Sequence, residues 1–222
     1  MRRQSGSRAR GSTARVADTS PGAPAANLRV GDLTQSSYSD AVGVLARGMR
    51  DNPLHVAAFG SDPDRRERAH AAMMRALFRH GRNNEPIGVW RGETLVACTG
   101  VLVRGGCRPS LSQLRMLPAI VGLGPRTVAR VAAWVRVWSA RDPDEPHAHL
   151  GPLAVDRHLQ GQGIGGTLLA EHCRRLDERG ELGYLETDRP ENVRFYEKQG
   201  YRVVGEAPAL GVPCWFMRRE PS

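Results

Sequence analysis

The chain has 222 residues, a formal net charge of +9 and a sequence pI near 10.4. Its length suits one well-buried domain. The sequence contains no run of 18 apolar residues, so no membrane-spanning helix is predicted. The positive charge is compatible with nucleic-acid binding, but aromatic residues make up only 5% of the chain, so base-stacking platforms are not expected.

The cysteines and the first residues bear on the cellular compartment. The four cysteines form no CxxC pair, so they signal neither a zinc site nor a redox motif. Cys98 and Cys173 lie within apolar patterns and are expected to be buried thiols. Arg2 and Arg3 are not followed by the apolar stretch of a signal peptide. We therefore expect a reduced, cytoplasmic protein with no nucleic-acid or membrane partner.

The first 26 residues are rich in Ser, Gly, Ala, Arg and Pro and contain almost nothing to bury. Residues 1–26 therefore predict a disordered basic tail, followed by a single domain over 27–222. Apolar periodicity next predicts a strand, two helices and a pair of strands, at 28–33, 38–49, 63–81 and 86–103. The paired strands are expected to join at Arg91-Gly92.

Residues 109–140 predict a helical insert, in which Gly124-Pro125 separates two helices. One apolar stripe follows the second helix and consists of Val128, Val131, Ala132, Val135 and Trp138. Such a stripe is typical of core packing. The alternative is that it forms the wall of a substrate pocket.

The second half of the chain alternates strands and helices. Residues 147–156 predict a strand interrupted at Gly151-Pro152, because proline lacks a ladder donor and fits best at a bulge. A helix is expected from about 166 to 179. The remaining elements are a strand, a helix and two strands, at 182–188, 190–200, 201–207 and 212–220. This alternation predicts an α/β (α+β) sheet with helices on its faces.

Four glycines lie between the interrupted strand and the helix that follows it: Gly161, Gly163, Gly165 and Gly166. A loop of this kind exposes backbone N–H groups at a helix N-terminus and allows an anion to approach closely, which suits a phosphate. A merely flexible turn is the alternative. The GK[ST] of a P-loop is absent, and a dinucleotide fingerprint would follow the first strand rather than a late one.

The segment Gln160-Gly161-Gln162-Gly163-Ile164-Gly165 matches the pattern Q/R-x-x-G-x-G/A. In this motif the chain resembles the GNAT superfamily of acyl-CoA-dependent N-acetyltransferases, in which the pattern binds pyrophosphate. The resemblance extends over 147–219 and includes the superfamily's N-x-x-F-Y-x-x-x-G-Y/F arrangement, which begins at Asn192. The first half of the chain matches only in the order of its elements. The "LET" strand and the closing G-x-P-x-W-x-M segment are similar, more weakly, to the puromycin N-acetyltransferase branch, without implying puromycin as the substrate.

This resemblance implies a GNAT-type mixed, mostly antiparallel sheet of about seven strands, flanked by helices and splayed between the fourth and fifth strands. It also implies acetyl-CoA as the acyl donor, with its pantetheine arm in the splay and a backbone N–H near Leu153 polarising the thioester. The residues implied to bind acetyl-CoA are Leu153, Ala154, Val155, Gln160, Gly161, Gln162, Gly163, Ile164, Gly165, Gly166, Asn192 and Tyr196.

Two residues are candidates for moving protons. Tyr196 matches the superfamily tyrosine close to the sulfur, where a phenol could protonate the leaving thiolate; a half-buried helix aromatic is the alternative. Glu186 alternates with Tyr184 and Asp188 on one face of its strand and could act as the base. Its alternative is an ion pair with an arginine, either Arg189 or Arg202.

His147 and His149 flank Ala148 and point the same way from the interrupted strand. Either histidine could act as a base near pH 7, although a strand-end role is the simpler interpretation. No third ligand has a suggestive spacing, so no metal site is predicted.

These features favour an acetyl-CoA-dependent N-acetyltransferase that acts on the primary amine of a small molecule. Two alternatives stay open: a protein or peptide N-acetyltransferase, and a catalytically silent acyl-CoA-binding module. The acceptor groove is expected to be shaped by residues 34–80 and 109–140, which contain no motif that identifies the acceptor.

Overall fold

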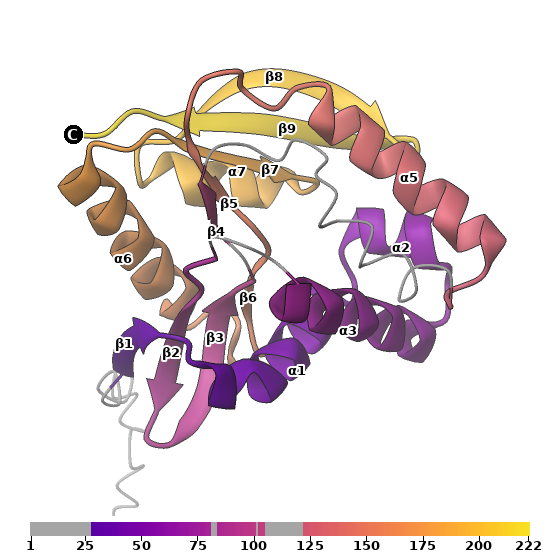
Figure 1. Cartoon of the computed structure of the whole chain (residues 1–222), viewed down its shortest axis with the longest axis horizontal. Helices are drawn as coiled ribbons and strands as arrows, with labels where there is room; N and C mark the ends of the chain where they lie inside the picture. The colour runs from indigo at the N-terminus through magenta and orange to yellow at the C-terminus, as the bar shows by residue number, and fades with distance from the viewer. Residues whose placement is uncertain (1–27, 81–83, 101, 105–121) are drawn as a thin grey trace, which may run out of the picture.

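The computed structural model describes residues 28–80, 84–100, 102–104 and 122–222 (Figure 1). The predicted tail at 1–26 and residues 109–121 of the predicted helical insert lie outside the described residues. No helix in the described ranges is both long enough and apolar enough to cross a membrane.

Two sheets account for the strands of this part of the chain, with the orders β1-β2-β3-β6 and β4-β5-β7-β9-β8. All strand pairs are antiparallel except β5–β7, which is parallel. The strands are β1 (Leu28–Asp32), β2 (Ile87–Arg91), β3 (Thr94–Thr99), β4 (Leu102–Arg104), β5 (Ala148–Leu150), β6 (Leu153–Val155), β7 (Gly183–Thr187), β8 (Arg202–Ala209) and β9 (Val212–Arg219). The expected mixed, mostly antiparallel architecture is confirmed.

The strand count differs from the expected seven because two of the predicted strands are each broken in the middle. The third predicted strand divides into β3 and β4 at Gly100, and the fourth divides into β5 and β6 at Gly151-Pro152. The two breaks lie side by side: the Gly100 N–H donates to the Pro152 carbonyl at 2.6 Å. A Cβ at Gly100 would lie 2.9 Å from Pro152 Cδ, so this close approach requires glycine.

The chain changes sheets at Gly151-Pro152. Before the break, β5 pairs with β7, and after it β6 pairs with β3 in the other sheet. Within the described strands β6 makes no second pair, so its outer edge faces the gap that opens beside β7. This is the predicted splay between the fourth and fifth strands.

Six helices are described, together with two short 3₁₀ segments: α1 (Tyr38–Met49), α2 (Pro53–Phe59), α3 (Pro63–His80), α5 (Pro125–Ser139), α6 (Ile164–Arg179) and α7 (Pro190–Glu197). The start of α5 agrees with the predicted break at Gly124-Pro125. Helix α2 was not predicted, because its seven residues are too few to show a helical period.

Helices cover both faces of each sheet (Figure 1). In the first sheet, α1 and α3 pack on one face and α6 on the other. In the second sheet, α2 and α5 pack on the face that contains Tyr184 and Phe216, and α7 packs on the face that contains Leu185 and Met217. Buried side chains on both faces explain why the strands are apolar on successive residues.

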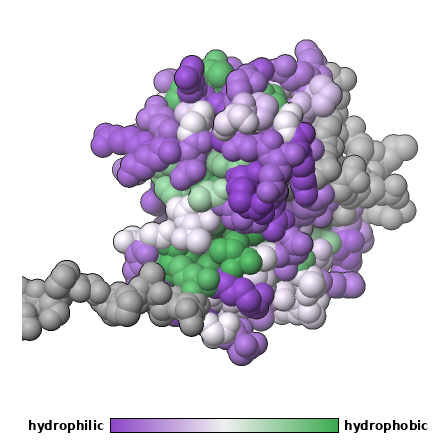
Figure 2. All heavy atoms as spheres, turned by 90° about the vertical axis from the view of Figure 1, so that its left-hand side faces the viewer, coloured by the Kyte–Doolittle hydropathy of each residue, from purple (hydrophilic) through white to green (hydrophobic). Residues whose placement is uncertain are grey.

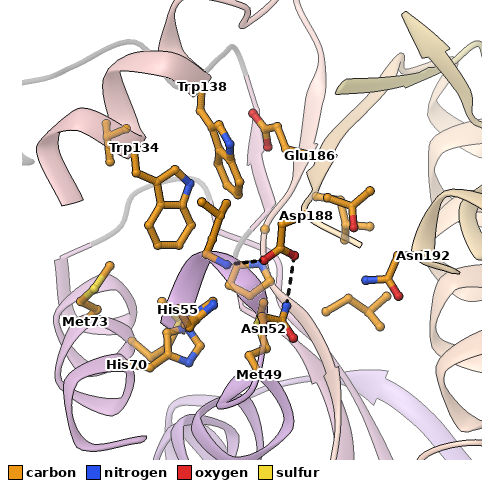
Figure 3. Close-up of a pocket in the computed structure, with 18 of the residues that line it drawn as sticks. Met49, Asn52, His55, His70, Met73, Trp134, Trp138, Glu186, Asp188 and Asn192 are labelled. Atoms are coloured by element: carbon orange, nitrogen blue, oxygen red, sulfur yellow. Dashed lines mark hydrogen bonds between the residues drawn. The ribbon is translucent and has the colours of Figure 1, made fainter. Parts of the chain in front are cut away.

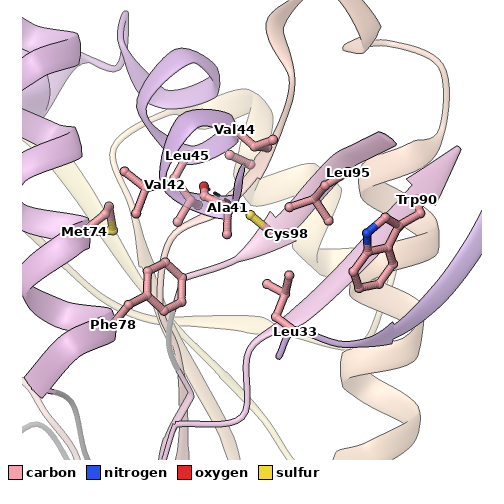
Figure 4. Close-up of a cluster of buried hydrophobic side chains, with 11 residues drawn as sticks. Leu33, Ala41, Val42, Val44, Leu45, Met74, Phe78, Trp90, Leu95 and Cys98 are labelled. Carbon is pink, nitrogen blue, oxygen red and sulfur yellow. Dashed lines mark hydrogen bonds between the residues drawn. The ribbon is translucent and has the colours of Figure 1, made fainter. Parts of the chain in front are cut away.

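The core beneath α1 holds that helix against β6 (Figure 4). Leu45 is fully buried there, and truncating such a residue to alanine typically costs about 2–5 kcal/mol. The contact with β6 is close at Gly48, where a Cβ would lie 2.6 Å from the Val155 carbonyl oxygen. Cys98 and Cys173 are buried, as predicted.

Many of the charged side chains on the outer surface of α6 form ion pairs. This helix lies on the side of the molecule that faces the viewer in Figure 2, where most residues are hydrophilic. Arg174 and Arg175 both bond Glu171, and Arg175 also reaches Asp32 of β1 at 2.5 Å. Large exposed apolar side chains in the described part of the chain are few: Val56, Val135, Val203 and Val204.

Candidate active site

A cavity of about 230 Å³ extends from the splay to α5 (Figure 3). The breaks and ends of β5, β6 and β7 line one part of it, and α1, α2, α3, α5 and α7 supply the rest. It therefore lies where the two sheets separate, at the end of the gap beside β6.

The glycine loop forms an uncapped N-terminus for α6. Gly161 and Gly163 have φ values of 79° and 80°, in the left-handed region that favours glycine. Gly163 is the N-cap residue, and no side chain accepts a hydrogen bond from the first amides of the helix. A Cβ added at Gly161, Gly163 or Gly166 would meet nothing within 4 Å, so there is open space beside the loop. The loop is therefore a shaped N-terminus with room for an anion, rather than an arbitrary turn.

Three of the predicted loop side chains hold the loop in place. The Gln160 amide donates to the carbonyl oxygens of Gly48 at 3.2 Å and Val155 at 3.1 Å. Gln162 accepts from Arg91 at 3.2 Å, and Ile164 is buried in the core beneath α6. Because these side chains are used within the protein, the groups that these positions present to a ligand are chiefly backbone N–H groups.

Two of the predicted residues on α7, Asn192 and Tyr196, line the cavity together. The Tyr196 side chain is only 7% exposed, and its ring contacts Phe195 and Tyr201. Burial raises the pKa of the Tyr196 phenol well above its usual value, and the nearby Asp188 carboxylate raises it further. The phenol is therefore protonated at neutral pH and can donate a proton into the cavity.

Glu186 bonds a histidine instead of an arginine. Its Oε2 lies 2.8 Å from His149 Nε2, and the Glu186 side chain is 2% exposed. The alternative ion pair with Arg189 or Arg202 is therefore wrong; Arg189 donates to the Asp51 carbonyl. The partner comes from β5, which pairs with β7 at this point.

Behind Glu186 lies a network that the sequence interpretation missed. Asp142 Oδ1 is 3.5 Å from His149 Nδ1 and 3.3 Å from His147 Nε2. His147 Nδ1 lies 2.9 Å from the Glu145 carbonyl, to which only a protonated nitrogen can donate. The two histidines therefore do more than end a strand, and Asp142 is the third group that their spacing did not reveal.

The ligand atoms of Asp142, His147 and His149 all lie within 4.8 Å of one another, close enough to hold a divalent cation. The same contacts also connect Glu186 to a chain of groups that can accept a proton or stabilise its arrival.

Asp188 is a second buried acid in the cavity, just beyond the end of β7. It accepts the Leu54 N–H at 2.8 Å and approaches the Asn52 side-chain amide at 3.5 Å (Figure 3). Burial raises the pKa of Asp188, although the Leu54 bond opposes the shift. Asp188 therefore joins β7 to the first turn of α2, a contact that no local pattern indicated.

The far end of the cavity is built by α2, α3 and α5. His55 and His70 are 3% and 2% exposed, their ring centroids are 4.5 Å apart, and the His55 ring meets Trp134 edge-on at 5.5 Å. Burial lowers the pKa of His70 to about 4 and that of His55 well below its usual value, so both rings are neutral at pH 7.

Helix α5 both packs into the core, as predicted, and lines this cavity; that the cavity binds the substrate stays a prediction. Val131, Trp134, Val135 and Trp138 line the cavity, and Val131 and Trp134 are also buried in the core. Ala132, which was expected on the apolar stripe, is exposed.

The comparisons with known proteins agree with this architecture. The family model described as Acetyltransferase (GNAT) family matches residues 56–201. A solved protein described as histone acetyltransferase HPA2 and related acetyltransferase, from Corynebacterium glutamicum, superposes with a TM-score of 0.67 at 20% identity, covering 88% of this chain and 97% of its own.

Two further solved structures share the fold. Arylalkylamine N-acetyltransferase 2 from Aedes aegypti has a TM-score of 0.63 at 11% identity, with 88% of this chain and all of its own chain covered. The PaiA N-acetyltransferase from Thermoplasma acidophilum, solved with coenzyme A, has a TM-score of 0.54 at 13% identity, with 87% and 99% covered.

The chain belongs to the GNAT acetyltransferase family. It is an acyltransferase whose acyl donor is acetyl-CoA.

Proposed function

We propose that this chain transfers the acetyl group of acetyl-CoA to the primary amine of a small molecule. The observation that carries the proposal is the single cavity that joins the splay to a buried inner end. At that end His55, His70 and Trp134 are buried, and the whole cavity has a volume of only about 230 Å³. A cavity of this size suits a compact acceptor better than a peptide, which needs an extended groove.

The donor site of this proposal is the glycine loop together with the outer edge of β6. The pyrophosphate would bind the first amides of α6, which no side chain caps. The pantetheine arm would follow the edge of Leu153–Val155 into the splay, with Asn192 beside it. Ala154 contributes only backbone, because its side chain is buried beneath α1.

The proposed reaction is direct attack of a neutral amine on the thioester carbonyl, with a backbone N–H near Leu153 stabilising the oxyanion. The carbon–nitrogen bond forms, the carbon–sulfur bond breaks, and the CoA thiolate takes its proton from the Tyr196 phenol. The proton lost by the amine goes to Glu186. His149 Nε2 shares a hydrogen bond with Glu186, so the proton can pass on to the imidazole, whose positive charge the Asp142 carboxylate, 3.5 Å from Nδ1, would favour.

The test is turnover of acetyl-CoA, followed as free thiol release, against a panel of small primary amines and a panel of peptides. We expect thiol release with small amines and little with peptides. Release with peptides alone would instead support a protein or peptide N-acetyltransferase. Binding of acetyl-CoA with no release in either panel would identify a silent binding module.

A further inference from the structure

The inner end of the cavity contains buried polar atoms that have no hydrogen-bond partner within the described residues. They are both ring nitrogens of His55, Nδ1 of His70 and Nε1 of Trp134. Buried polar groups are nearly always hydrogen-bonded, since each one left unsatisfied costs about 1–3 kcal/mol. All three side chains line the cavity, and Figure 3 shows both imidazoles on the side of it opposite Asn192. A polar group of a ligand bound in this cavity would supply a partner for them.

The chemistry of these atoms indicates what the ligand offers. Because both imidazoles are neutral, each carries one donor and one acceptor, and the indole adds a donor. A hydroxyl group is a donor and an acceptor at once, so it can bond one ring nitrogen of His55 in either tautomer. A carboxylate or phosphate would need a cation, and these neutral rings do not provide one.

Charge along the cavity supports the same conclusion. The chain contains 32 Lys and Arg residues, yet none lies among the described residues that line this cavity. Its only charged side chains there are those of Glu186, which lies beside Trp138 in Figure 3, and Asp188, which lies above Asn52. The cavity therefore attracts an ammonium group at its reactive side and disfavours an anionic substituent.

Size and surface indicate the body of the ligand. Trp134, Trp138 and Met73 form much of the wall, and such side chains pack well against a flat ring. A cavity of about 150 Å³ accommodates benzene, so the part of the 230 Å³ that the donor leaves free has room for about one ring.

We propose that the acceptor is a primary amine on a short chain attached to an aromatic ring, with a hydroxyl group on the ring that bonds His55 and with no carboxylate. This inference rests on the proposed function, whose acceptor it specifies.

The test compares three amines that differ by one group: tyramine, phenethylamine, which lacks the hydroxyl, and tyrosine, which adds a carboxylate. In the unmodified protein we expect kcat/KM for tyramine to exceed that for phenethylamine about 3- to 10-fold, the value of one neutral hydrogen bond. We expect tyrosine to be poorer than tyramine by at least tenfold, about 1.4 kcal/mol. Equal use of tyrosine, or of phenethylamine, would overturn the proposal, and this comparison needs no variant.

The variant His55→Phe should lower kcat/KM for tyramine to the value for phenethylamine, so that the ratio of the two falls from about 3- to 10-fold to about one. Its melting temperature should stay the same or rise, because an unpartnered polar group is replaced by an apolar one of similar shape. His80→Phe, at the end of α3 and outside the cavity lining, is the matched control and should keep the preference. A preference that survives in His55→Phe would place the hydroxyl elsewhere and refute the assignment.

Failure of the proposed function gives a different result. In that case acetyl-CoA binds but no amine releases thiol, and calorimetric titration of tyramine, phenethylamine and tyrosine into the CoA complex still ranks the three ligands. Tyramine binding best supports the site; no binding, or binding of all three alike, refutes it.

Discussion

Tyr196 and Glu186 enter the cavity from different elements, α7 and β7, and their surroundings differ accordingly. Tyr196 lies in an apolar cluster with Leu185 and Tyr201, where burial favours the neutral phenol. Glu186 shares a hydrogen bond with His149, whose imidazole can itself take up a proton. The proposed proton donor and the proposed proton acceptor therefore lie in different environments, which suits the two proton transfers of acetyl transfer to an amine.

Replacing Tyr196 with Phe should lower kcat by about 10²-fold or more, because general acid catalysis contributes about 10² to 10⁴. The ring and its packing are retained, so affinity for acetyl-CoA, measured by calorimetry, and the melting temperature should barely change. A Tyr196→Phe protein with full activity would show that another group protonates the thiolate.

The matched variant is Glu186→Gln, which is close to isosteric and removes the proposed base. An acceptor amine of low pKa arrives already neutral, so it should partly rescue Glu186→Gln but not Tyr196→Phe. Rates measured with both amines separate the two roles, and equal rescue of both variants would contradict them.

At the scale of elements, α6 is organised by the two glycines at its ends. Gly163 begins the helix with φ of 80° and Gly180 ends it with φ of 61°. Their backbone conformations are similarly strained for any other residue, yet only Gly163 lies in the loop beside the splay. The end of the helix is further tied to β9 by the bidentate pair of Arg219 with Asp177, at 2.7 and 2.8 Å.

Because the two glycines have similar backbone conformations, Gly180 provides a control for a test of the glycine loop. Gly163→Val should weaken acetyl-CoA binding at least tenfold, about 1.4 kcal/mol, because a branched side chain occupies the space that the pyrophosphate needs. Gly180→Val introduces comparable backbone strain at the other end of the same helix and should leave the affinity unchanged. Calorimetry on both folded variants checks this, and equal affinities would refute the loop assignment.

Across the whole molecule, three buried histidines couple stability to pH. Burial lowers the pKa of His70 to about 4, that of His172 to about 3, and that of His55 also well below its usual value near 6.5. His172 is satisfied by the Tyr201 hydroxyl at 2.9 Å, whereas His55 is not bonded within the described residues. The raised pKa of Asp188 has the opposite effect on stability, because the folded chain binds this proton more readily than the unfolded chain. That effect occurs at lower pH, near the usual pKa range of an acid.

We therefore expect the free energy of unfolding to fall as the pH decreases below about 6.5. In that range the unfolded chain binds protons that the folded chain does not, and each histidine contributes up to about 1.4 kcal/mol per pH unit until its folded pKa is reached. Denaturant unfolding between pH 7 and 5 measures the slope. His55→Phe should make it smaller, and an identical slope would show that His55 is not buried neutral.

Local patterns sufficed wherever the chemistry lies in one stretch of chain. The glycine loop, Tyr196 and Asn192 could be predicted as candidate site residues because neighbouring residues set the helix start and the helix face, and Tyr196 and Asn192 do line one cavity. The break at Gly151-Pro152 was likewise visible, since proline cannot continue a ladder. The splay itself was expected only through resemblance to the GNAT superfamily, and the strand pairs confirm it.

Only the tertiary structure revealed the residues that α2, α3 and α5 contribute to the cavity, and the partners of the buried groups in it. Asp188 meets Leu54, which is 134 positions earlier, and His55 meets Trp134 across the helices α2 and α5. Burial, hydrogen-bond satisfaction and the resulting pKa shifts depend on which segments pack together, and sequence spacing does not contain that information. Helix α2 was too short to show a period, so its place at the cavity could be seen only after folding had brought β7 against it.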